Sequence, residues 1–195
     1  MKSAGTVELL CDSVRWIEEV PRVALLVYAS MPGYFDVLFA GTNGTLLELS
    51  TWIQRPGSVF SHERVRVVRQ EAIVVGVTVE LPHHELTPRQ RDDSSWLLQH
   101  SNAAQRRNLA TNAELLRAVA PPPCDGAYYL RCLAVDENRR GLGLGHQLMS
   151  ACVSNAIKGG FNSLHLDVRA DNAAALALYR HHGFAQVAET LVPAA

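Results

Sequence analysis

The most constraining feature of the sequence is a run in which every second residue is glycine: Arg140-Gly141-Leu142-Gly143-Leu144-Gly145. The apolar run before it predicts a strand over 128–135, and the residues after it predict a helix over 146–158 with one apolar face. Glycines allow positive φ and close approach of a ligand, and the N–H groups of such a turn and of the helix start attract anions. With the charge of Arg140, the segment predicts a phosphate or pyrophosphate site.

Two common phosphate loops fit this run poorly. A Walker loop requires Gly-Lys-Ser/Thr, whereas His146-Gln147 follows the last glycine. A dinucleotide fingerprint is spaced G-x-G-x-x-G, whereas this run is spaced G-x-G-x-G, and no acidic residue ends the next parallel strand in the usual place. An oxidoreductase on a dinucleotide fold is therefore only a remote alternative.

The elements after the glycine run alternate between strand and helix. We expect a strand over 163–168, a helix that is capped by Asp171 or Asn172 and runs to about His181, and a last strand over 184–189. Such an alternation is typical of an α/β layered fold.

The first half of the chain adds an antiparallel part to the predicted sheet. Residues 64–69 and 72–81 predict a β-hairpin whose first strand has one wet face and whose second strand is buried on both faces. Residues 82–123 are polar, contain helical patches and end in three prolines, so we expect a helical insertion between two strands. The predicted fold class is therefore α/β: a mixed, mostly antiparallel β-sheet flanked by helices.

The N-terminal part predicts helices after a short strand. Residues 6–12 resemble a strand, and residues 13–31 have helical spacing with a break or restart at Pro21. Residues 36–52 can hold a helical pair separated by Gly41-Thr42-Asn43-Gly44.

Composition narrows the class of protein. The chain has 195 residues, 48% hydrophobic and 19% charged, which is typical of one globular domain over 1–195. A net charge of −1 gives no basic surplus for nucleic acid, and no apolar run is long enough for a membrane span. Charged residues interrupt the N-terminus early, so we expect no signal peptide and a cytoplasmic location.

Metal binding is not expected from the cysteines and histidines. The four cysteines are scattered without zinc spacing, and they read as free thiols. His165, His181 and His182 are not spaced as metal ligands either. We therefore predict no metal.

A second motif follows the glycine run by about 30 residues: Asn172, Ala175, Leu178, Tyr179, Gly183 and Phe184. It resembles the signature N-x-x-A-x-x-L-Y-x-x-x-G-F of the GNAT superfamily of acetyl-CoA-dependent N-acetyltransferases at every fixed position. Arg140, Gly143 and Gly145 also match the GNAT loop Arg/Gln-x-x-Gly-x-Gly/Ala in register. The resemblance covers residues 128–189, and the earlier elements agree with it in outline.

The resemblance implies an acetyl-CoA site with these positions. The main chain of Leu133 and Val135 would pair with the pantetheine arm, and Asn172 would hydrogen-bond it. The pyrophosphate would be held by Arg140, Gly141, Leu142, Gly143, Leu144 and Gly145. The N–H of Leu133 would polarise the thioester carbonyl, and Tyr179 would protonate the leaving thiolate. From the residues alone, the favoured interpretation of Tyr179 is a core residue of an amphipathic helix, and Asn172 can be a helix cap.

The general base is not implied by the resemblance. Some family members place a glutamate where this chain has Tyr129, whose ordinary pKa near 10 makes a poor base. Asp125, Cys132 and His62 are weaker candidates, and none is assigned.

The acceptor is expected to be a small-molecule or peptide amine, bound partly by the insertion 82–123. The family usually continues past the Gly-Phe strand into a hairpin, whereas Ala195 ends this sequence 11 residues after Phe184. The last strand is therefore expected either to be missing or to be supplied by a partner chain, and the second alternative favours a homodimer with strand exchange or edge pairing. A non-catalytic acyl-CoA sensor of the same fold is the alternative function.

Overall fold

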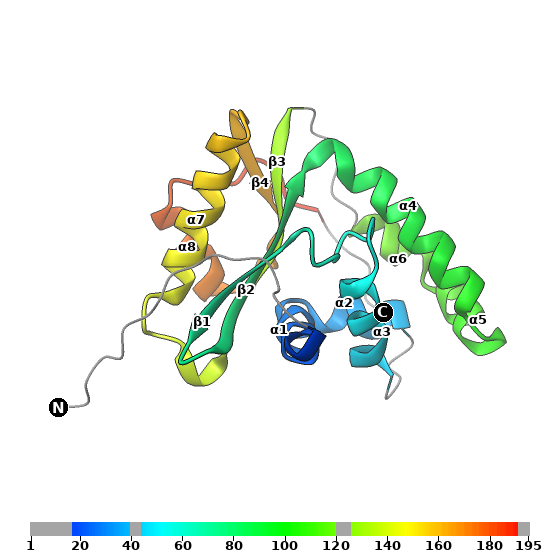
Figure 1. The fold of residues 1–195 in the computed structure, drawn as a ribbon. Helices are drawn as coiled ribbons and strands as arrows, with labels where there is room; N and C mark the ends of the chain where they lie inside the picture. Colours follow the sequence, from blue (N-terminus) through cyan, green and yellow to red (C-terminus); the bar gives the residue numbers. More distant parts are fainter. Residues whose placement is uncertain (1–16, 40–43, 120–125, 191–195) are drawn as a thin grey trace.

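The computed structural model describes residues 17–39, 44–119 and 126–190. Within these ranges the chain forms short 3-10 helices (η), α-helices and strands in an order that places the predicted hairpin before the insertion (Figure 1). The elements are η1 (Ile17–Glu19), α1 (Val20–Ser30), α2 (Pro32–Phe39), α3 (Thr45–Gln54), β1 (Val65–Gln70), β2 (Ile73–Pro82), α4 (His83–His100), α5 (Ala103–Thr111), α6 (Ala113–Ala118), β3 (Ala127–Val135), η2 (Glu137–Arg139), α7 (Leu144–Lys158), β4 (Ser163–Leu166) and α8 (Ala173–His181).

The described strands form one sheet in the order β1-β2-β3-β4. The β1/β2 and β2/β3 pairs are antiparallel, and β3/β4 is parallel. Helices α7 and α8 cover one face of the sheet, and α1 with the neighbouring helices covers the other (Figure 1). The predicted fold class, a mixed and mostly antiparallel sheet flanked by helices, is confirmed.

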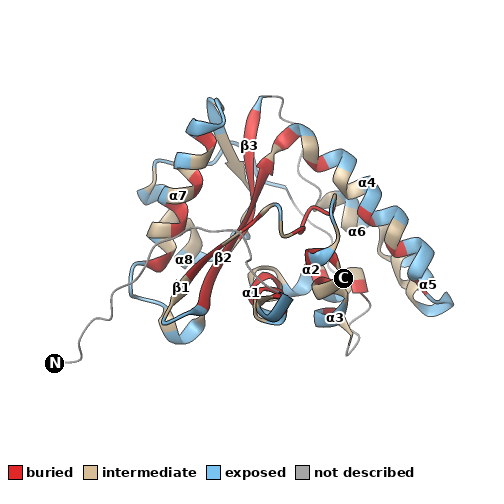
Figure 2. Cartoon of the chain, in the orientation of Figure 1, coloured by how far each residue is buried: buried red, intermediate tan, exposed pale blue. Residues whose placement is uncertain are grey.

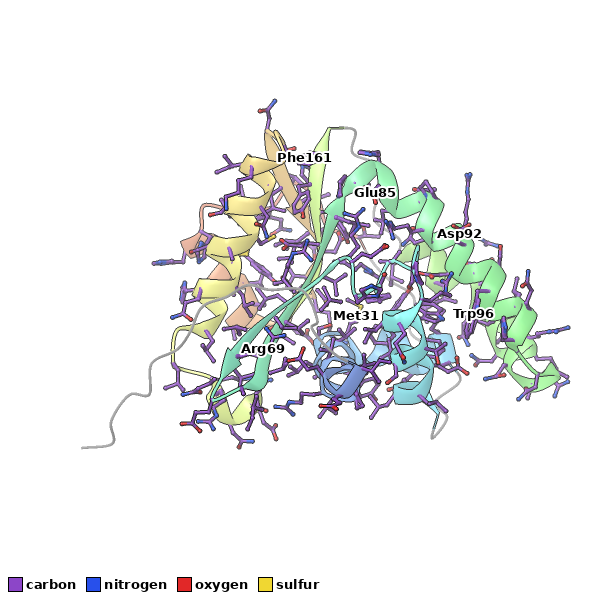
Figure 3. All side chains as sticks on the ribbon, in the orientation of Figure 1. Met31, Arg69, Glu85, Asp92, Trp96 and Phe161 are labelled. Atoms are coloured by element: carbon purple, nitrogen blue, oxygen red, sulfur yellow. The ribbon has the colours of Figure 1, made fainter. Side chains whose placement is uncertain are left out.

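Each face of the sheet has its own apolar core. The larger core joins β1, β2 and β3 to α1, α2 and α3, and it contains aromatic rings in stacked and edge-to-face contact: Phe35, Phe39, Trp52 and Phe60. The smaller clusters join α7 to β3 and β2. Strand β2 is buried along nearly its whole length because both layers cover it, as the sequence predicts (Figure 2). Figure 3 shows side chains filling the space between the sheet and both helical layers.

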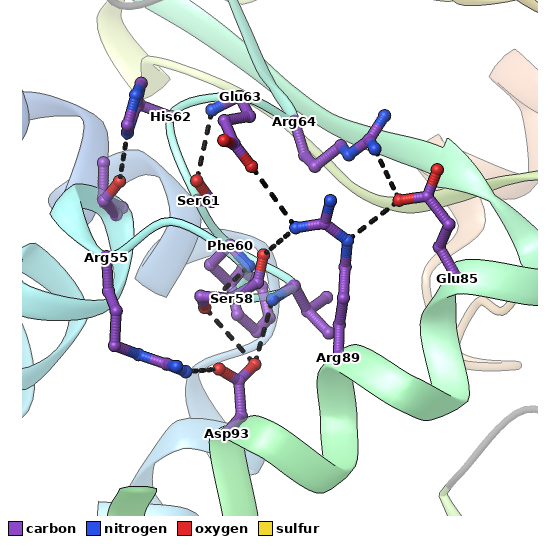
Figure 4. Close-up of polar contacts among 12 residues, drawn as sticks. Arg55, Ser58, Phe60, Ser61, His62, Glu63, Arg64, Glu85, Arg89 and Asp93 are labelled. Carbon is purple, nitrogen blue, oxygen red and sulfur yellow. Dashed lines mark hydrogen bonds and ion pairs between the residues drawn. The ribbon is translucent and has the colours of Figure 1, made fainter.

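The insertion between β2 and β3 contains α4, α5 and α6, so its helical character is confirmed. A polar network fixes α4 to residues 55–64 (Figure 4). Asp93 is 4% exposed, forms an ion pair with Arg55 and accepts a bond from the N–H of Val59 at 3.0 Å. Glu85 binds Arg64 and Arg89 at 2.5 and 2.9 Å. The insertion is therefore a fixed part of the structure along α4.

Most predicted boundaries hold within two or three residues. The hairpin turns at Glu71 and Ala72, both with positive φ, one residue later than expected. Pro21 lies in the first turn of α1, where its missing N–H has no cost, so it restarts the helix. Helix α7 begins at Leu144, two residues before the predicted start. The predicted opening strand over 6–12 lies outside the described residues.

The predicted last strand over 184–189 is wrong. Residues 184–190 contain no strand, and Val187 is 88% exposed. A strand forms only with a hydrogen-bonded neighbour, and in the described sheet this segment pairs with none. The N–H of Phe184 instead bonds to the carbonyl of Tyr179 at 3.1 Å.

No single helix in the described ranges is both long and apolar enough to cross a membrane. Helices 17–30 and 32–39 meet the length and composition requirement only as a pair, bent by 105°. The inner faces of both belong to the larger core.

Candidate functional site

The candidate site begins where β3 and β4 separate. Residues Ala127–Leu130 pair with Ser163–Leu166, but β3 continues to Val135 without that partner. The N–H of Asp136 bonds to the carbonyl of Val75 in β2 at 2.8 Å. Because successive residues of a strand point their N–H and C=O groups to opposite sides, those of Leu133 and Val135 point away from β2. They face the side that β4 has left.

A β-bulge in β3 accompanies this separation. Glu80 of β2 lies opposite Leu130, and Val79 lies opposite Cys132, so Arg131 is the extra residue. A bulge bends its strand and changes the direction of the side chains around it. Here it re-aims the end of β3 just beyond its last pair with β4.

The glycine run follows β3 and provides an anion-binding turn. Gly141 and Gly143 have φ values of 79° and 78°, and Gly143 is the N-cap of α7. The first N–H groups of an α-helix have no partner within the helix, so they are available to an anion at this end. Arg140 is exposed beside them and forms no ion pair within the described part of the chain.

Gly145 differs from the other two glycines. It lies inside the first turn of α7, and a Cβ there would come within 3.4 Å of Cδ2 of Leu178 in α8. A contact at this distance is an ordinary van der Waals contact, so the space between α7 and α8 would admit a Cβ at Gly145. The expectation that all three glycines form the turn is thus corrected to two.

Helix α8 carries both residues of the second motif that were assigned to the site. The side chain of Asn172 caps α8 by accepting a bond from the N–H of Ala175 at 3.1 Å. Tyr179 packs in the cluster formed by α7 and β3. Burial, followed by the neighbouring Cys132 and Cys152, raises the pKa of the Tyr179 hydroxyl to about 12. The hydroxyl is therefore protonated at neutral pH.

A pair of residues that the sequence did not reveal lies where β4 ends. The hydroxyl of Tyr129 donates to Oδ2 of Asp167 at 2.5 Å. Burial is the main cause that raises the pKa of Tyr129 well above its ordinary range. The tyrosine thus stays protonated, and the carboxylate of Asp167 is the acceptor. The sequence could have pointed to Asp167 by its position near the end of the predicted strand over 163–168. That its partner is Tyr129 follows only from the parallel register of β3 and β4.

The weaker base candidates do not join this pair. Burial raises the pKa of the Cys132 thiol to about 11, so the thiol stays protonated at neutral pH and cannot accept the proton of the amine. His62 points toward α3, with Nδ1 3.1 Å from the carbonyl of Ile53. Asp125 lies outside the described residues.

The described histidines do not form a metal centre. Nδ1 of His146 lies 3.1 Å from Nε2 of His182, beside the glycine turn. Over residues 17–39, 44–119 and 126–190, no group of three or more His, Cys, Asp or Glu side chains is placed to hold a metal ion.

Comparison of this sequence with known proteins places the two motifs within one family model. The model described as the acetyltransferase (GNAT) family matches residues 89–184. A segment of 56 residues is 46% identical to mycothiol acetyltransferase of Jonesia denitrificans. That match covers 29% of this chain and 18% of the relative, so the chain corresponds to less than a fifth of that protein's length.

Solved structures share the fold over most of their length. An N-acetyltransferase from Staphylococcus aureus Mu50 has a TM-score of 0.69 and 17% identity, covering 89% of each chain. A crystal structure of an acetyltransferase has a TM-score of 0.63 and 22% identity, covering 92% of this chain and 90% of that one. The aminoglycoside N-acetyltransferase AAC(6')-Iy in complex with CoA has a TM-score of 0.52 and 10% identity, covering 91% and 89%. By the family match, residues 89–184 are a segment of the GNAT acetyltransferase family, and the solved structures show that the chain shares their fold.

Proposed function

We propose that this chain is an acetyl-CoA-dependent N-acetyltransferase that transfers acetyl directly to an amine in a ternary complex. The observation that carries the proposal is the separation of β3 from β4 next to the glycine turn. A free strand edge can pair with an extended amide-containing arm, and it leads here to a turn suited to an anion. A pantetheine arm that ends in a pyrophosphate has these two parts in the same order.

The donor would be held by residues from three segments. The main chain of Leu133 and Val135 binds the arm, and the turn from Arg140 to Gly145 binds the pyrophosphate through the N–H groups of Gly141, Leu142, Gly143, Leu144 and Gly145. Asn172 uses its carbonyl oxygen for the helix cap, so its NH₂ group is the part that can contact the arm. Tyr179 lies beside the sulfur. No metal takes part in the proposal.

The transfer step uses one acid, one base and one N–H donor. The amine nitrogen attacks the thioester carbon, a C–N bond forms, and the N–H of Leu133 stabilises the negative charge on the oxygen. The C–S bond then breaks, and Tyr179 gives its proton to the thiolate. The proton lost by the amine passes to Asp167, directly or through the hydroxyl of Tyr129. Protons and charges therefore balance across the step.

The wider setting of the reaction is part of the same proposal. Residues 1–195 form one domain, and the acceptor is a small-molecule or peptide amine rather than a nucleic acid or a membrane. The location is cytoplasmic. Strand β4 is the last in the described sheet order, so its outer edge is open to a second copy in a homodimer.

Two measurements test the proposal. Acetyl-CoA should raise the melting temperature while NAD should not, because only the first fits a free strand edge and an anion turn. Acetyl-CoA with a panel of amines should then yield acetylated amine and free CoA. A melting temperature unchanged by acetyl-CoA contradicts the proposed site, whereas binding without transfer to any amine favours the alternative of an acyl-CoA sensor.

A further inference from the structure

Arg131 is a buried cation without an anionic partner. The residue is 9% exposed, and it occupies the bulge of β3. No carboxylate in the described ranges forms an ion pair with it, although several other arginines have one. An arginine is charged at any physiological pH, so its charge cannot be avoided by losing a proton.

Aromatic rings cover the guanidinium but do not neutralise it. Its carbon lies 4.8 Å from the ring centroid of Tyr34 and 5.8 Å from that of Phe60. The Nε atom is buried and has no hydrogen-bond partner. Aromatic faces attract a cation, and the side chains of Tyr34 and Tyr129 interact with the guanidinium, but no carboxylate in the described ranges pairs with its charge. A buried charge without a counter-charge lowers the free energy of unfolding unless a ligand completes its hydrogen bonds.

The position of Arg131 connects it with the proposed reaction. After burial, the charge of Arg131 is the next largest influence on the pKa of Tyr129, and it acts in the lowering direction. Tyr129 in turn binds Asp167 at 2.5 Å. Leu133, whose N–H is proposed to contact the thioester, lies two residues after Arg131 in β3. The unpaired cation therefore lies next to the pair of Tyr129 and Asp167, which is proposed to take the proton of the acceptor amine.

We propose that Arg131 binds a carboxylate of the acceptor, so that the substrate is an amine that also carries a carboxylate, such as an amino acid or a peptide. This inference rests on the proposed function and specifies its substrate class. A carboxylate matches the planar guanidinium with two parallel hydrogen bonds, and its single negative charge balances the single charge of Arg131. The aromatic rings of Tyr34 and Phe60 hold the guanidinium plane in place for that contact.

The test compares matched ligands by equilibrium binding. The twenty common L-amino acids, each beside its C-terminal amide, are titrated into the protein with and without saturating CoA. Each pair differs only in the carboxylate. We expect at least one acid to bind about 10- to 100-fold more tightly than its amide, the range of a charge-assisted hydrogen bond converted to an equilibrium ratio.

Three variants assign this preference to the guanidinium. Arg131→Met should reduce the acid-to-amide ratio to about 1, and Arg131→Lys should retain part of it because the charge remains but the two parallel bonds are lost. Arg106→Met, a change at an exposed arginine of α5, should leave the ratio unchanged. Melting temperatures measured in parallel show whether each variant is folded. A ratio is used because a structural loss would weaken both members of a pair alike.

The inference is overturned if no acid binds more tightly than its amide, or if Arg131→Met and Arg131→Lys both keep the preference of the unmodified chain. A separate result tests the proposed function: it is contradicted if acetyl-CoA does not bind, or if the protein supplied with acetyl-CoA acetylates none of the amines. A protein that acetylates amides as well as acids would keep the function and lose this inference.

Discussion

Alanine at two glycines of the same run should change stability in opposite directions. Gly143 has a φ of 78°, and a Cβ there would meet no atom within 4 Å. The cost of Gly143→Ala is therefore conformational, about 1–2 kcal/mol for an L-residue in the left-handed region. Gly145 has helical backbone, and its Cβ would make an ordinary contact with Leu178 at 3.4 Å. Gly145→Ala should stabilise the chain by about 0.5 kcal/mol through helix propensity.

Urea unfolding of the two variants measures this difference. The free energies of unfolding should differ by about 2 kcal/mol, which with an m-value of about 2 kcal/mol/M separates the midpoints by about 1 M. The unmodified chain should unfold between them. If Gly145→Ala destabilises as much as Gly143→Ala, then the assignment of positive φ to Gly143, and of helical backbone with room for a Cβ to Gly145, is refuted.

Further changes probe the acid, the base, the histidines and the insertion. Tyr179→Phe should lower kcat about 100-fold or more while the Kd of CoA changes little, measured by turnover and calorimetry; an unchanged kcat removes the acid. Asp167→Asn should also lower kcat, and full activity would exclude it as the base. Burial, then the charges of His146 and His181, lower the pKa of His182, so the unfolded chain binds that proton more readily. The free energy of unfolding should therefore fall as the pH drops below about 6.5, and it should fall less in His182→Gln. Urea midpoints at pH 7.5 and 5.5 measure both losses, and equal losses in the two proteins contradict this prediction. Asp93→Ala should lower the free energy of unfolding by about 3 kcal/mol and the Tm by about 6–12 °C, because Arg55 and the N–H of Val59 lose their partner. A drop in Tm of less than about 2 °C in calorimetry would contradict this role of Asp93.

The parts of the site that could be predicted are those whose chemistry is local in sequence. A glycine turn before a helix and an asparagine that caps α8 are short patterns, and both were confirmed at Gly143 and Asn172. The pair of Tyr129 and Asp167 could not be found in this way, because its members are 38 residues apart and meet only through the register of β3 and β4. The burial of Arg131 depends on a bulge that no local pattern announces.

The fold shows the same division. The hairpin, the helical insertion and α7 follow from periodicity and turn residues, which act over a few neighbours. The failed strand over 184–189 has a suitable apolar pattern, but a strand also requires a partner edge, and a pattern within one segment carries no information about its neighbours.

The short pairing of β3 with β4 also affects how the chain opens. Four residues of β4 are paired, none of them is buried, and α8 contributes no buried residue. A region with so few buried contacts exchanges its amide hydrogens through local opening, at a lower free energy than unfolding of the whole sheet. Asp167, Asn172 and Tyr179 all lie on this more weakly held part, whereas Leu133 and Arg131 lie on the firmly held strand. A ligand that bridges the two would slow amide exchange in β4 and α8 first, so half of the site would gain its rigidity from the molecule it binds.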